Sequence, residues 1–280
     1  MNNLDQPISA KDISSSSPIK TSNVMAEDFG IEIAAESVPL PSKGLIYHQD
    51  NPLFGKESLE IKPMTAREED ILTSRAYIKD GTVITKLIQS CLIDKSINPD
   101  DLISGDRNAL MVALRITGYG AEYDVEVTCP NCKASNKATF DLSELALKRL
   151  EIEPTELGEN SFNVVLPVTK KEVCVRFLNG HDEKDMLIQS ERKRKQGFVV
   201  ENTVTDRLVR SIISVEGIKD KNKINFFVKN LPVRDSLTLR RFLDKNEPGI
   251  NMTSHLKCSS CHEESEVNIP LGPSFFWPDA

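Results

Sequence analysis

The sequence predicts an internally duplicated α+β protein, in which two related halves form a pseudo-dimer that carries zinc-knuckle β-hairpins behind a disordered tail. Three observations predict this fold class. Two Cys-x2-Cys pairs each interrupt a run of alternating apolar residues, the two runs match without a gap, and a serine-rich acidic segment precedes them. The expected units are a tail over residues 1–37, a first repeat over 38–150 and a second repeat over 151–280.

The composition is that of a soluble globular protein kept in a reducing compartment. The chain has 280 residues, of which 39% are hydrophobic and 28% charged, enough for one large domain or two ordinary ones. No apolar run approaches the roughly 20 residues of a membrane helix, and no signal peptide is evident, so we expect no membrane contact. The net charge of −7 argues against a protein that coats nucleic acid.

The tail is expected to be disordered. It carries six serines in its first 25 positions, and over residues 1–37 it holds six acids against two lysines. Such a segment buries too little apolar surface to offset the conformational entropy that ordering would cost.

The first repeat opens with a turn at residues 40–44 (LPSKG) and a strand in SLEIKPM, and Tyr47 and Leu53 are expected core anchors. Thr65 and Glu68 then have the spacing of a capping box, so the acids at 68–70 fall in the first turn of a helix. Apolar residues at helical spacing predict two more helices, over residues 83–93 and 106–116, with Gly118 and Gly120 ending the last one.

The segment Tyr123–Leu142 predicts a β-hairpin with a metal knuckle at its tip. Apolar residues alternate before the tip at Tyr123, Val125 and Val127, and they alternate again after it at Ala138, Phe140 and Leu142. The tip itself is Cys129-Pro130-Asn131-Cys132.

The second repeat follows a linker that we expect to be helical, LSELALKRL, and it runs through the same order of elements. Strands are expected in SFNVVLPV and EVCVRFL, a cap at Asn179-Gly180, a helix opened by the acids at 182–185, and a helical stripe from Val204 to Ile212. Residues 106–142 match residues 235–271 without a gap at an offset of 129, and both cysteine pairs fall in register. This register predicts the duplication.

Four cysteines carry the predicted chemistry: Cys129, Cys132, Cys258 and Cys261. A tetrahedral Zn2+ site closed by four thiolates is structural rather than catalytic, so one shared ion would join the two repeats. Two separate or intermolecular half-sites, and a redox dithiol, are the alternatives, although a redox Cys-x2-Cys usually begins a helix. His255 and His262 flank the second pair and could replace a cysteine, but four cysteines already suffice.

Other motifs have ordinary explanations. The acids at 68–70 and 182–185 suit helix first turns, and the basic run Arg192–Lys195 suits a solvated helix end. No arrangement of nucleophile and base is readable, so we expect no enzyme. Phe275, Phe276 and Trp277 either pack back on the core or bind a partner protein, and they are the candidate partner-binding residues.

Several short motifs resemble one known family. They are LPSKG with Tyr47, EIKPMTAREEDIL, RITGYG with Tyr123, and the following CPNC. Together they resemble the baseplate hub subunits and hub assembly proteins of T4-like contractile-tailed bacteriophages, most clearly over residues 40–142. The resemblance implies a non-enzymatic role in building the hub through contacts with other hub and tail proteins. It also implies a location in the host cytoplasm during assembly, or in the tail baseplate of the virion.

A zinc-ribbon nucleic-acid-binding or regulatory protein is the alternative function. The basic run at 192–195 together with the two knuckles would support it. The net charge of −7 and the presence of only four Tyr and one Trp for base stacking oppose it.

Overall fold

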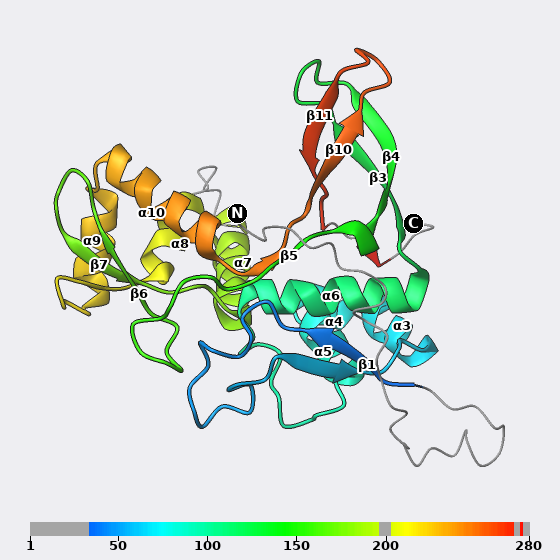
Figure 1. Cartoon of the computed structure of the whole chain (residues 1–280), viewed down its shortest axis with the longest axis horizontal. Helices are drawn as coiled ribbons and strands as arrows, with labels where there is room; N and C mark the ends of the chain where they lie inside the picture. The colour runs from blue at the N-terminus through cyan, green and yellow to red at the C-terminus, as the bar shows by residue number, and fades with distance from the viewer. Residues whose placement is uncertain (1–33, 196–202, 272–274, 277–280) are drawn as a thin grey trace.

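The computed structural model describes residues 34–195, 203–271 and 275–276 (Figure 1). Two helix-and-strand bodies lie side by side, and two β-hairpins rise together from them. The predicted disordered tail lies outside the described residues, apart from its last four. Of these, Glu36 and Ser37 begin the first strand.

The first body is organised around one long helix. Strand β1 (Glu36–Pro39) pairs antiparallel with β2 (Ser58–Ile61). The helices that follow are α3 (Ala66–Thr73), α4 (Arg75–Lys79), α5 (Val83–Cys91) and α6 (Ser104–Tyr119). Ten residues of α6 are buried, so this helix is enclosed on most sides. The predicted capping box at Thr65 is present at the start of α3, and the two later helices lie where their periodicity placed them.

The second body contains a three-stranded antiparallel sheet and a set of helices. The strands β6 (Phe162–Val165), β7 (Glu172–Val175) and β8 (Ile212–Val215) lie in that order. The helices are α7 (Gly180–Lys195), α8 (Thr203–Ser211), α9 (Lys221–Lys229) and α10 (Val233–Asn246). Asn179 caps α7 as expected, because its side chain accepts a hydrogen bond from the Asp182 N–H.

The structure confirms the hairpins that the alternating apolar residues predicted. Strand β3 (Glu122–Thr128) pairs with β4 (Ser135–Asp141), with Tyr123 opposite Phe140. Strand β10 (Thr253–Lys257) pairs with β11 (Glu264–Asn268). Tyr123, Val127 and Phe140 are buried while their neighbours along each strand point to solvent.

Three local predictions were wrong. The linker LSELALKRL is not helical: it forms a 3-10 turn (Leu142–Glu144) and then β5 (Leu147–Lys148), which pairs with β9 (Gly249–Ile250). Pairing with a strand 102 residues away overrides the local helical pattern. Gly118 lies inside α6, which ends only at Gly120, where the backbone has a positive φ of 87°. Ile212 begins β8 instead of continuing the α8 stripe.

One hydrophobic core runs through both bodies and the bases of the hairpins, and it includes the predicted anchors Tyr47 and Leu53. Among the described residues, no helix combines the length and apolar character that crossing a membrane requires.

Candidate metal centre

The two hairpin tips bring the four predicted cysteines together. Their sulfur atoms all lie within 4.8 Å of one another. Two close contacts cross from one hairpin to the other: Cys129 Sγ lies 3.8 Å from Cys261 Sγ, and Cys132 Sγ lies 3.6 Å from Cys258 Sγ. The first cysteine of each pair therefore faces the second cysteine of the other, which is the reciprocal pattern of an interface with two-fold symmetry.

Each tip folds into the same backbone turn. In the first hairpin the Cys129 N–H donates to the Ala134 carbonyl at 2.9 Å, and the Lys133 N–H donates to the Cys129 carbonyl at 3.0 Å. The same two hydrogen bonds recur around Cys258, each 3.0 Å long. Lys133 and His262, which follow the second cysteine of each pair, both have a left-handed φ, of 63° and 59°. Two such turns present both sulfurs of a pair on one side.

Polar contacts hold the two tips against each other. The Asn131 amide donates to the Ser265 hydroxyl at 3.1 Å. The backbone N–H and the hydroxyl of Ser259 both donate to Asn136 Oδ1, each at 2.8 Å. Asn136 is buried although it belongs to an exposed hairpin. Sequence reasoning missed these contacts, because nothing local indicates a partner more than 120 residues away.

Two thiols of the cluster have pKa values shifted in opposite directions. The backbone N–H groups of Cys261 and Ser260 lower the pKa of the Cys258 thiol to about 6. The backbone hydrogen bond at Glu263 lowers the pKa of Cys261, but burial and the neighbouring thiols raise it to about 12. Thiols this close titrate as one coupled group, so a cation among them would favour the thiolate form that binds metal.

The donor set fits a soft, closed site. Among the residues that the structure describes, the only group of at least three Cys, His, Asp or Glu side chains whose donor atoms meet at metal-binding distance is this set of four sulfurs. His255 and His262 are both exposed and are not part of the set. Four sulfurs suit tetrahedral Zn2+, which thiolates bind at about 2.3 Å.

The C-terminal aromatic residues pack inward where they are described. Phe275 and Phe276 are buried, with ring centroids 5.1 Å apart, and Phe275 meets the Tyr123 ring edge-on at 5.2 Å. Trp277 lies outside the described residues. A partner-binding role for these three residues stays a prediction.

The charged motifs lie where the helix explanation placed them. The acids at 68–69 and 182–183 occupy the first turns of α3 and α7. In the basic run, Lys193 forms an ion pair with Asp206 at 2.6 Å.

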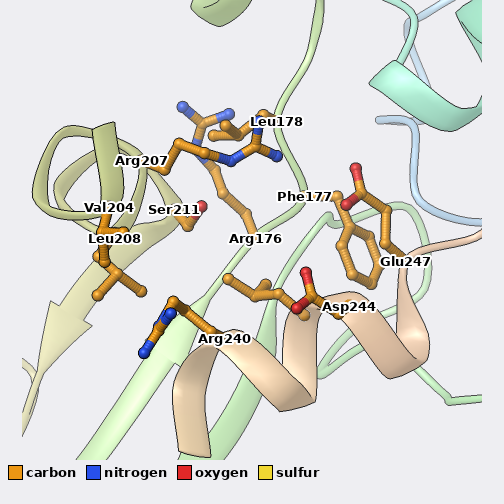
Figure 2. Close-up of a pocket in the computed structure, with 11 residues that line it drawn as sticks. Arg176, Phe177, Leu178, Val204, Arg207, Leu208, Ser211, Arg240, Asp244 and Glu247 are labelled. Atoms are coloured by element: carbon orange, nitrogen blue, oxygen red, sulfur yellow. The ribbon is translucent and has the colours of Figure 1, made fainter. Parts of the chain in front are cut away.

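A cavity of about 170 Å³ lies between α8 and α10 (Figure 2). Leu208 and Leu243 contribute apolar surface, and Arg207, Arg240 and Glu247 contribute charge. Burial raises the pKa of Glu247 to about 6. No nucleophile and base are paired among the described residues that line this cavity.

Comparison with known protein families identifies the family of the chain. A family model described as T4 bacteriophage base plate protein matches residues 46–277, which is most of the chain. No curated protein and no solved structure shows significant similarity to the chain.

Proposed function

Since the chain belongs to the T4 bacteriophage base plate protein family, we propose that it is a structural or assembly protein of the baseplate hub of a contractile phage tail. It acts through contacts with other hub and tail proteins, and it performs no catalysis. The family match supports the baseplate role. The four sulfurs support the non-enzymatic part, because a metal held by all four would keep no open position for a substrate.

The proposal includes one structural zinc ion, bound by Cys129, Cys132, Cys258 and Cys261. The meeting of four sulfurs from two hairpins is the observation that carries it. Structural zinc contributes roughly 10–16 kcal/mol of apparent binding free energy in small peptides, so one ion could hold the two hairpins together.

Metal analysis tests the zinc site. We expect one zinc per chain in protein purified without added metal, and loss of this zinc in the Cys132→Ser variant. Two ions per chain would contradict the shared site, and a metal-free protein with six free thiols would contradict any site.

The proposal also includes the internal duplication. Two partly buried ion pairs support it: Lys62 with Glu68 lies in the first half and Arg176 with Asp182 in the second, and each residue of one pair is 114 positions from its counterpart in the other. The reciprocal sulfur contacts support it independently.

The hub role is tested in the phage. A phage that lacks this gene should accumulate filled heads without complete tails, and electron microscopy should show no finished baseplates. Plasmid-borne wild-type protein should restore them. Infectious particles with normal baseplates in the absence of the gene would contradict the proposal.

A further inference from the structure

A second cleft lies between α7, α8, β8 and α9, with a volume of about 550 Å³. Its apolar lining is here called the floor and its charged lining the rim, which has four Arg or Lys residues against two Asp residues. Both aspartates, Asp182 and Asp206, already form ion pairs. The lining residues of the cleft include Val209, Ile212, Ile213, Arg210, Lys219 and Lys221. We propose that this cleft is a docking site for an amphipathic helix with an acidic side, supplied by another hub or tail protein. The inference rests on the proposed assembly role and names one kind of partner for it.

The floor of the cleft matches a surface that is covered in the first half. Val209 and Ile213 of the second half correspond, 121 positions later, to Ile88 and Leu92. Ile88 and Leu92 are 0% and 1% exposed, whereas Val209 and Ile213 are only partly buried. The same apolar positions are therefore sealed in one half and open in the other.

A helix seals this surface in the first half. Helix α3 packs on α5, and its Leu72 is fully buried. Helix α7 holds the corresponding place 114 residues later, but Met186, the counterpart of Leu72, is only partly buried. The covering element in the first half thus shows what kind of segment fits the open surface: a helix that offers an aliphatic side chain.

Helix α7 is joined to α8 by ion pairs near the protein surface. Lys193 and Asp206 are 2.6 Å apart and both side chains are more than a third exposed. Arg210 and Asp185 are 3.6 Å apart. Pairs of this kind contribute about 0–1 kcal/mol each, so these two pairs hold α7 against α8 only weakly.

The charge of the rim selects an acidic partner. Arg176 is already bound to Asp182 through two 2.7 Å hydrogen bonds. Lys219 and Lys221 are exposed, and neither side chain forms an ion pair or a hydrogen bond within the part of the chain that the structure describes. Acidic side chains on a docking helix would meet these ammonium groups, and the apolar floor favours a helix over the phosphates of a nucleic acid.

The test uses the full chain and a peptide probe. A helix-stapled, fluorescein-labelled peptide with the sequence of residues 64–73 (MTAREEDILT) carries three acids against one arginine, together with Ile71 and Leu72. We expect saturable binding with a Kd of about 10–100 μM in fluorescence anisotropy. The variant Lys219→Glu/Lys221→Glu should weaken binding by about 10-fold or more, because it reverses the charge of the rim.

A matched control separates the cleft from general charge attraction. The variant Lys223→Glu/Lys229→Glu changes two exposed lysines on α9 that do not line the cleft, and it should bind within about 2-fold of wild type. Ile213→Asp should weaken binding through the floor, and its circular dichroism spectrum and melting temperature show whether it still folds.

Three outcomes would overturn the inference. They are the absence of saturable binding up to about 1 mM, equal weakening by both lysine pairs, and cleft-dependent binding of duplex DNA without binding of the peptide. Peptide binding and tail assembly are separate readouts. Normal tails without the gene, together with a cleft that binds the peptide, would reject the hub role and leave the docking site standing.

Discussion

The two halves of the molecule place a buried aspartate at the same point of their long helices and surround it differently. Asp106 near the start of α6 and Asp235 near the start of α10 are 129 residues apart, and both are fully buried. Asp106 accepts hydrogen bonds from the backbone and hydroxyl of Ser42 and from the Tyr47 hydroxyl. Asp235 accepts from the backbone N–H groups of Val168 and Thr169, at 2.8 and 3.0 Å.

This difference gives the two carboxyl groups opposite pKa shifts. Burial raises the pKa of Asp106 despite its hydrogen bonds from Ser42 and Tyr47. Burial also acts to raise the pKa of Asp235, but its hydrogen bonds with the backbone of Val168 and Thr169 outweigh it and lower the pKa. Under the proposed duplication, one position therefore holds an enclosed acid in the first half and an ionised helix-start acid in the second.

A second pair of corresponding carboxylates, Glu68 and Asp182, differs in side-chain length, but each binds a basic side chain near the start of a helix. Glu68 is bound by Lys62, Thr65 and Ser90, with the Lys62 ammonium at 2.8 Å. In the second half the carboxylate of Asp182 is bound by an arginine and by the N–H of an asparagine. The pairs 114 residues apart are Lys62 and Arg176, Thr65 and Asn179, and Glu68 and Asp182. Each position keeps its charge or polarity with a different side chain.

The first half is the more enclosed of the two. Ten residues of α6 are buried, but only Asp235 and Leu239 of α10 are. The linker contributes to the enclosure, since the Leu150 N–H donates to the Pro41 carbonyl at 3.0 Å. The corresponding loop of the second half leaves Val168 48% exposed. Equivalent substitutions should therefore cost more stability in the first half, except at the proposed zinc site, to which each half contributes two cysteines.

The cysteines should give the largest effect and the same effect in both halves. Cys129→Ser and Cys258→Ser each remove one thiolate from the proposed shared site. Each should lose zinc affinity and several kcal/mol of unfolding free energy, because structural zinc contributes roughly 10–16 kcal/mol in small peptides. The double variant should lose little more than either single variant. Melting temperature and zinc content, measured together, check this.

Cys174→Ser is the control for the cysteine series, because its thiol is partly buried outside the cluster. It should retain one zinc per chain. Strictly additive losses for Cys129 and Cys258 would instead indicate two independent sites.

The two buried aspartates should differ. Asp106→Ala leaves the Ser42 and Tyr47 donors without an acceptor in the core, and each unsatisfied buried group costs about 1–3 kcal/mol. We expect a loss of about 3–5 kcal/mol. Asp235→Ala leaves the N–H groups of Val168 and Thr169 without an acceptor, but these lie in a more exposed loop. This variant should lose about 2–3 kcal/mol of unfolding free energy. Urea unfolding measures both, and a larger loss for Asp235→Ala would reverse the ranking of the two halves.

Stability should depend on pH in opposite directions through Glu68 and Asp106, because their pKa values are shifted in opposite directions. Burial opposes ionisation of Glu68, but hydrogen bonds from Lys62, Ser90 and Thr65 lower its pKa from 4.5 to about 2. Because the folded pKa is the lower one, the stability from Glu68 is present above pH 4.5 and is lost as pH falls toward 2. For Asp106, whose folded pKa is raised, the sign is reversed: its contribution is lost as pH rises.

Unfolding free energy measured from pH 6 to pH 2.5 tests the Glu68 sign. In Glu68→Gln, the fall in unfolding free energy between pH 6 and pH 2.5 should be smaller than in the wild type by about 1–2 kcal/mol, after allowance for solvent screening. Asp182→Asn should reduce this fall as well, since the pKa of Asp182 is also lowered, by Arg176 against burial. An unchanged fall in both variants would contradict the proposed roles.

The sequence predicted the elements whose cause is local. The hairpins, the cysteine cluster and the Thr65 cap depend on alternation, spacing and neighbours a few residues away. It did not predict α9, the β5–β9 pair or the buried aspartates, which depend on contacts between distant segments. One signal could have indicated the aspartate sites: Leu40-Pro41 and Leu166-Pro167 stand 126 residues apart and open the two loops that bind them.

The smallest expected effect comes from exchanging the cations of the equivalent ion pairs. Arg176 makes two 2.7 Å hydrogen bonds to Asp182, one from each terminal nitrogen, which a lysine cannot reproduce. Arg176→Lys should therefore lose about 1–2 kcal/mol of unfolding free energy. Lys62→Arg keeps the charge beside Glu68 and should change stability by less than about 1 kcal/mol. Equal losses would show that charge alone matters at these positions, and that the two halves use their cations in the same way.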